Sequence, residues 1–171
     1  MKKRFLIAAV AVLSLGLCLE SCKKSDPDPE PKALTATFTV DPKTSSDLMG
    51  IYDFSFDYNI KDAKNASQKN TVVLTAARKF ENITCPCTIE VNYRFNRKSG
   101  ATIDATKEYR LEWGPSYTIV SSEGAILSLS SSSTRMDVVG ANVTALFDEL
   151  NKTDNKITYT IDKDGKVSKT E

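Results

Sequence analysis

The sequence predicts a mostly β protein, an antiparallel β-sandwich or barrel of about eight strands with one short helix. Three observations lead to this fold class. From residue 33 onward, apolar and polar residues alternate with a period of two, which is typical of half-buried strands. Turn-forming Gly, Pro, Asn and Asp residues separate these runs at regular intervals. Helical spacing is found in one stretch only, near residues 142–151.

Four alternating runs predict strands in the first half of this β-rich region. They lie at residues 34–40, 52–60, 71–77 and 89–95. The third run is apolar on both faces, and this pattern predicts a strand in the centre of a sheet. The polar segments between the runs, at residues 42–50 and 61–70, are expected to be loops.

The second half is expected to contain further hairpins. A turn at residues 97–100 is expected to bring a strand ending at Trp113 back beside the fourth strand, with solvated ion pairs between the two. The serine-rich residues 128–133 are interpreted as a connector or an edge strand. The remaining strands are expected at residues 117–121, 125–130, 157–161 and 166–169.

The predicted helix rests on four apolar residues. Val143, Leu146, Phe147 and Leu150 follow the spacing of one helix face, and Asn142 is the expected N-cap. Its length of about three turns makes it a minor element of a β domain.

Composition narrows the chemistry available to the chain. The 171 residues include no histidine, which excludes Ser-His-Asp and Cys-His catalysis and removes the commonest zinc ligand. The formal charge of +1 offers no basic patch for nucleic acid. We identify no metal site, no cofactor and no catalytic constellation, and the sequence therefore favours a protein that is not an enzyme.

Cys85 and Cys87 are separated by a single proline. One interpretation is a thiol-disulfide exchange site. The other is structural: either a strained local disulfide or two reduced thiols at the start of a strand. No helix N-terminus visibly follows them, and no histidine is available to lower a thiol pKa, so the structural interpretation is favoured.

The aromatic residues alternate with polar ones along the predicted strands, which is typical of core positions. Trp113 is the expected exception. It ends a strand next to Gly114-Pro115, where its ring is a candidate ligand contact.

The N-terminus has the features of a secretory signal. Three basic residues follow Met1, an apolar run extends from Phe5 to Leu19, and a small residue precedes Cys22. The segment Leu19-Glu20-Ser21-Cys22 resembles the lipobox of bacterial lipoproteins. Cys18 fits this pattern less well, because the bulky Leu17 lies directly before it.

This resemblance implies that residues 1–21 are a cleaved signal peptide and that Cys22 carries a diacylglyceryl group and an acylated amino terminus. Residues 22–32 are then a lipidated, proline-rich acidic tether, and residues 33–171 a single β-rich domain. After cleavage the formal charge is −1, because three basic residues and one acidic residue leave with the signal.

The resemblance further implies a membrane partner through the lipid and a location at the outer membrane, facing the periplasm or the surface. Lys23 follows the cysteine in place of the Asp that often retains lipoproteins in the inner membrane. The expected function is non-catalytic binding or assembly, with a glycan, a peptide or an envelope protein as partner. The alternative is a small envelope thiol-disulfide protein that uses Cys85 and Cys87.

Overall fold

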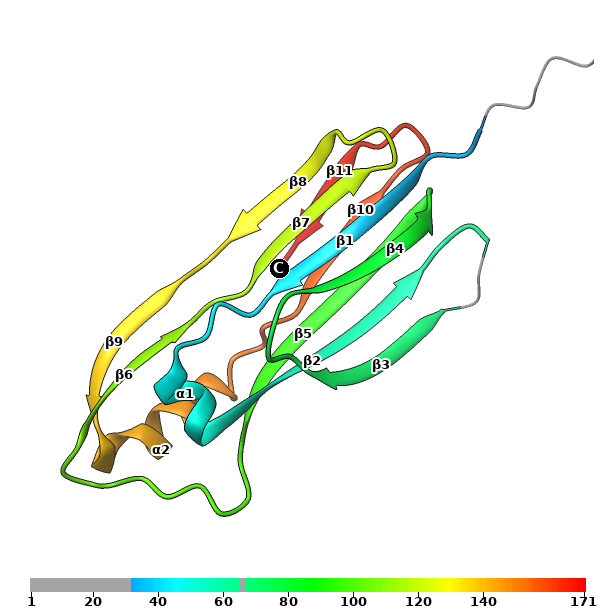
Figure 1. The fold of residues 1–171 in the computed structure, drawn as a ribbon. Coiled ribbons are helices and arrows are strands. Elements are labelled where there is room, and N and C mark those ends of the chain that lie inside the picture. Colours follow the sequence, from blue (N-terminus) through cyan, green and yellow to red (C-terminus); the bar gives the residue numbers. More distant parts are fainter. Residues whose placement is uncertain (1–31, 65–66) are drawn as a thin grey trace, which may run out of the picture. The chain divides into compact units, whose positions relative to one another are not determined.

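Two antiparallel β-sheets pack face to face and form a sandwich, one of the two architectures that the sequence predicts, with eleven strands in the described residues rather than about eight (Figure 1). The computed structural model describes residues 32–64 and 67–171, of which Ala33–Glu171 form one unit. The expected signal peptide, lipidated Cys22 and most of the tether lie outside the described residues. No closed barrel is present in the described part of the chain.

The first sheet has four strands in the order β4-β1-β7-β8, and the second has five in the order β11-β10-β5-β2-β3. A two-stranded sheet is formed by β6, which directly precedes β7 along the chain, and β9, which directly follows β8. The strands are β1 (Thr35–Asp41), β2 (Tyr52–Lys61), β3 (Gln68–Val73), β4 (Arg78–Thr84), β5 (Cys87–Arg97), β6 (Glu108–Trp113), β7 (Ser116–Ser121), β8 (Ile126–Ser131), β9 (Thr134–Val139), β10 (Ile157–Ile161) and β11 (Val167–Thr170).

Aromatic side chains from both sheets fill the space between them. Phe38 of β1 packs against Tyr159 of β10 with ring centroids 6.2 Å apart, and Phe56 of β2 lies 6.4 Å from Tyr117 of β7. These four side chains are at most 2% exposed. The alternation seen in the sequence therefore marks the inward face of each strand, because successive side chains of a strand point to opposite faces.

One end of the sandwich is closed by two short helices. Helix α2 (Gly140–Leu150) confirms the predicted helix, but it begins earlier than expected, because Val139 and not Asn142 is its N-cap. Its Phe147 is fully buried against Tyr52. Helix α1 (Ser46–Ile51) lies in the segment expected to be a loop, and Ser45 caps it by accepting a hydrogen bond from the Leu48 backbone N–H at 3.3 Å.

Two strand predictions were wrong. The run at residues 71–77 is not a central strand: β3 ends at Val73, forms an edge of its sheet and is largely exposed, and β4 begins at Arg78. The strand that ends at Trp113 does not return beside β5, since β6 pairs with β9 while β5 lies between β2 and β10. The ion pairs expected between them are replaced by pairs with other strands, such as Arg94 with Asp57 and Glu112 with Arg135.

Gly114 marks the bend between β6 and β7. Its φ of +142° is in the region that favours glycine, and a Cβ added there would lie 2.3 Å from the carbonyl oxygen of Ser132. A larger residue would therefore displace the backbone of the neighbouring β8–β9 segment. This close approach allows the two neighbouring segments, β6–β7 and β8–β9, to continue side by side from the four-stranded sheet into the β6–β9 pair.

Candidate functional site

The structure places Trp113 in the core, which corrects the expectation that its ring is exposed at a strand end. The side chain is 5% exposed and packs against Phe95 and Phe147, with centroid distances of 6.4 and 5.7 Å. Helix α2 covers this strand end, and the sequence did not show where that helix packs. Trp113 is therefore unavailable as a platform for a ligand.

Cys85 and Cys87 are both free thiols, and each is 5% exposed. No disulfide joins the two residues in the structure. Of the two structural interpretations, this arrangement corresponds to two reduced thiols. Burial raises the pKa of Cys85, and it raises that of Cys87 to about 12, with a further contribution from the neighbouring Cys85. Both thiols are therefore protonated at neutral pH, the opposite of what a thiolate nucleophile requires.

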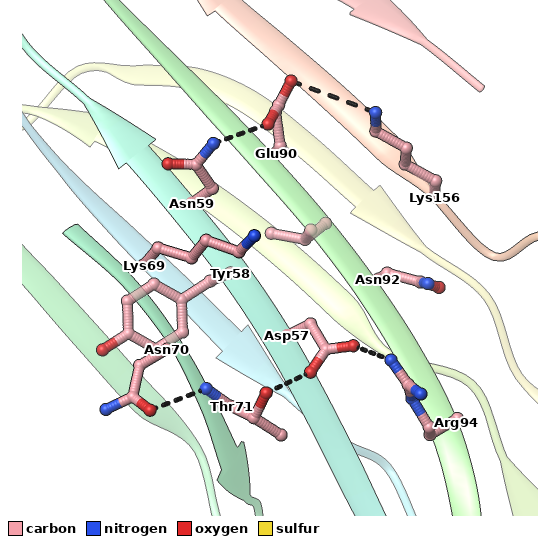
Figure 2. Close-up of a pocket in the computed structure, with 11 residues that line it drawn as sticks. Asp57, Tyr58, Asn59, Lys69, Asn70, Thr71, Glu90, Asn92, Arg94 and Lys156 are labelled. Carbon is pink, nitrogen blue, oxygen red and sulfur yellow. Dashed lines mark hydrogen bonds and ion pairs between the residues drawn. The ribbon is translucent and has the colours of Figure 1, made fainter. Parts of the chain in front are cut away.

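A recess of about 370 Å³, lined by several charged and amide side chains, lies on the outer face of the five-stranded sheet (Figure 2). We call it the outer recess. Residues of β2, β3 and β5 line it, together with Lys156, which directly precedes β10. Alternation along β2 and β5 directs Asp57 and Asn59, and likewise Glu90 and Arg94, away from the core. The lining residues are Asp57, Tyr58, Asn59, Lys69, Asn70, Thr71, Glu90, Val91, Asn92, Arg94 and Lys156.

Two rows of interacting side chains cross the outer recess. In one row, Glu90 accepts a hydrogen bond from the Asn59 amide at 2.7 Å and lies 4.0 Å from the Lys156 ammonium. In the other, Asp57 pairs with Arg94 and accepts a hydrogen bond from the Thr71 hydroxyl at 2.5 Å. Each row joins one carboxylate to one cation, so its formal charges balance.

Lys69 and Asn92 lie between the two rows. Lys69 is exposed on β3 and forms no ion pair within 4 Å with any described residue. Asn92 is half-buried on β5, and its carboxamide makes no hydrogen bond to the described part of the chain. The outer recess therefore has one uncompensated positive charge, next to an amide with free donor and acceptor atoms.

The pKa of Asp57 reflects this arrangement. Partial burial alone would raise the pKa of its carboxyl, but the hydrogen bonds from Thr71 and Arg94, with the charges of Arg94 and Lys69, outweigh this and hold it below the ordinary value. Asp57 is consequently ionised at neutral pH, and its negative charge compensates the positive charge of Arg94. Lys69 acts on Asp57 from beyond ion-pair distance, and its ammonium is free for an external partner.

The described residues offer no exposed aromatic platform and no cluster of three or more metal-ligating side chains. The outer recess offers charged, amide and hydroxyl groups, with the half-buried ring of Tyr58 also in its lining. In the same part of the chain, no helix has the length and apolar character needed to cross a membrane.

Comparison with known proteins found no similarity: no protein-family model, curated protein or solved structure matches the chain. The arguments about function below rest on the residues themselves.

Part of the outer recess was recognisable in the sequence, because the alternation places Asp57, Asn59, Glu90 and Arg94 on the outward faces of their strands. Lys69 was missed, since residues 61–70 were expected to be a loop. The assembly of the recess depends on the pairing of β2 with both β3 and β5, and strand order is not readable from alternation.

Proposed function

We propose that this chain is an outer-membrane lipoprotein, anchored through Cys22, whose β-sandwich is a non-catalytic binding module that takes its ligand at the outer recess. The observation that carries the proposal is the free Lys69 ammonium between two internally neutralised rows. A binding surface needs polar groups whose hydrogen-bonding capacity is not already used within the protein. Lys69 and Asn92 meet this requirement.

The chemistry of the outer recess favours a carboxylated glycan. A single uncompensated cation selects a ligand with a negative group, and the amide of Asn92 can donate to and accept from hydroxyl groups. Interfaces between proteins usually have an apolar centre. Val91 is 1% exposed and Tyr58 is half-buried, so neither apolar side chain of the lining is fully exposed in the recess.

The burial and raised pKa of both thiols support the non-catalytic proposal over the thiol-disulfide alternative. A thiol must ionise and be accessible before it can attack a disulfide, and Cys85 and Cys87 meet neither condition in the folded structure.

Replacement of Lys69 tests the ligand site. The full-length protein in detergent should bind oligogalacturonate, a carboxylated glycan, and not neutral dextran, when both are titrated calorimetrically at low salt. Lys69→Met should weaken this binding about tenfold or more, since a hydrogen bond to a charged group contributes about 1.5–3 kcal/mol. Added salt should weaken binding of the parent protein as well.

Lys79→Met is the matched control, because Lys79 is also exposed and unpaired among the described residues but lies on β4 of the other sheet. It should leave the affinity unchanged. If Lys69→Met binds oligogalacturonate as well as the parent, or if no carboxylated glycan binds, the outer recess is not the proposed site.

Replacement of Cys22 tests the anchor. Cys22→Ala should leave the protein unprocessed or release it from the outer-membrane fraction, because the thioether that holds the lipid can no longer form. Cys18→Ala is the control and should fractionate normally. A Cys22→Ala protein that still sediments with the outer membrane would show that another feature anchors the chain.

A further inference from the structure

Strand β8 forms one edge of the four-stranded sheet, and among the described residues it pairs with β7 alone. Figure 1 shows it in yellow along one margin of the fold. Residues 128–131 of the serine-rich segment thus belong to an edge strand. The outer side of such a strand presents backbone N–H and C=O groups that have no partner in their own sheet, and another chain can pair with them.

The two larger sheets have four edge strands, and β8 differs from the other three in charge. Each of the others contains a lysine: Lys69 in β3, Lys79 in β4 and Lys169 in β11. Charged residues, and lysine above all, are the usual protection of an edge strand against pairing with a second chain. The chain has no charged residue from Gly124 to Thr134, so β8 lacks this protection.

The outer face of β8 is also apolar. Ile126 and Leu129 are 67% and 66% exposed. Leu129 points away from the core, because the adjacent Ser128 lies opposite the buried Ile119 in the register of β7 and β8. Of the five large apolar side chains that are exposed among the described residues, four lie on β8 and the following strand β9. Exposed apolar side chains that gather in one place are typical of an interaction surface.

A second copy of β8 is the partner that fits this edge. The chain's own tether does not, because Pro27, Pro29 and Pro31 have no backbone N–H to donate to a β-ladder. Pairing of β8 with a different edge of a second copy would leave one β8 open and allow continued growth. Pairing of β8 with β8 places no charges opposite one another, and a two-fold axis closes the assembly at two copies.

From these observations we infer that β8 is a self-association surface. Two copies of the chain pair through their β8 strands, antiparallel about a two-fold axis, and join their four-stranded sheets into one continuous sheet. Backbone hydrogen bonds supply the contact, and Ile126 and Leu129 cover it on the outer face. The strand is only six residues long, so the dimer is expected to be weak. The β8 contact is independent of the outer recess and goes beyond the proposed function.

A lysine placed on β8 tests the inference, because it gives this edge the protection that the other three have. The full-length protein in density-matched detergent should show a monomer–dimer equilibrium in analytical ultracentrifugation. Leu129→Lys should raise the dissociation constant of the dimer about tenfold or more, and Ile126→Lys should do the same from a second exposed position. Thermal unfolding of both variants checks that they fold.

Val73→Lys is the matched control. Val73 is also an apolar residue of an edge strand, 51% exposed on β3, but it belongs to the other sheet. This substitution should leave the dissociation constant of the dimer within about twofold of the parent value. Lys69→Met should also dimerise as the parent does, which separates self-association from ligand binding at the outer recess.

Hydrogen exchange locates the contact. The fast-exchanging backbone amides of residues 126–131 should exchange about tenfold or more slowly when the protein is concentrated above the dissociation constant, and those of residues 68–73 should not change. Three results would overturn the inference: the protein stays monomeric at the highest concentration reached, which would leave β8 to a strand of another protein; both lysine variants of β8 associate as tightly as the parent; or the protection appears at another edge strand.

Discussion

The inner and outer faces of strand β2 contribute differently to the protein. Phe54 and Phe56 point inward, are at most 1% exposed and contact aromatic rings of both sheets. Asp57 and Asn59 point outward and form the middle of the outer recess. Because neighbouring residues of one strand point to opposite faces, stability and binding can be altered separately by substitutions only a few positions apart.

Phe56→Ala should disrupt the packing of the inner face, and we expect it to lower the free energy of unfolding more than the other substitutions. Its side chain is fully buried, and truncation of a buried Phe costs about 3–5 kcal/mol of unfolding free energy through lost transfer energy and a residual cavity. Chemical denaturation measures this change. Lys61→Ala, on the same strand but exposed, should change stability by less than about 0.5 kcal/mol. Equal effects of the two would contradict the division between faces.

The thiols provide a second test of the inner face, since Cys87 begins β5 and is buried there. At pH 8 a disulfide reagent should label the Cys85–Cys87 peptide more than about 100-fold more slowly than free cysteine, because the raised pKa leaves little thiolate.

The labelling rate should keep rising as the pH approaches the raised pKa of Cys87, about 12, and unfolding in guanidinium should restore the ordinary rate. Mass spectrometry of the digested protein follows this peptide alone. Rapid labelling of the folded protein at pH 8 would instead favour the thiol-disulfide alternative.

Asp57→Asn should have the smallest effect, since it removes an outer-face ion pair worth less than about 1 kcal/mol. The pKa of Asp57 is lowered in the folded state, so its contribution is present above the unfolded pKa of about 3.9 and is lost as the pH falls through the lower folded value. The difference in stability between the parent and Asp57→Asn should therefore shrink below about pH 4.

Asp164→Asn is the control for this substitution, because the Asp164–Lys163 pair is almost fully exposed and should contribute nothing measurable at any pH. Thermal unfolding of both variants between pH 2 and 7 gives the comparison. If the difference in stability between the parent and Asp57→Asn grows on acidification, the pKa of Asp57 is not lowered in the folded state.

Strands with an alternating run or a clear turn beside them were predictable, whereas β4 and β9, which have neither, were not. Strands β1, β2, β5 and the hairpins β7–β8 and β10–β11 lie where the pattern places them. Strand β9 is almost entirely exposed, so it carries no alternation by which to recognise it. The apolar run at 71–77 misled because Leu74 enters the core beyond the end of β3, while Val73 is 51% exposed. An apolar run is buried only where other elements of the fold pack against it.

The sequence by itself determined the fold class, the inward residues of the long strands and the outward position of Asp57, Asn59, Glu90 and Arg94, because period-two alternation is a local property of each strand. Tertiary structure alone decided which strands are neighbours, and hence that Lys69 joins the outer recess, that Trp113 is covered by α2, and that β8 is left at an edge of its sheet. These features depend on strand order and packing between distant segments, which are set by the whole core rather than by any one run of residues.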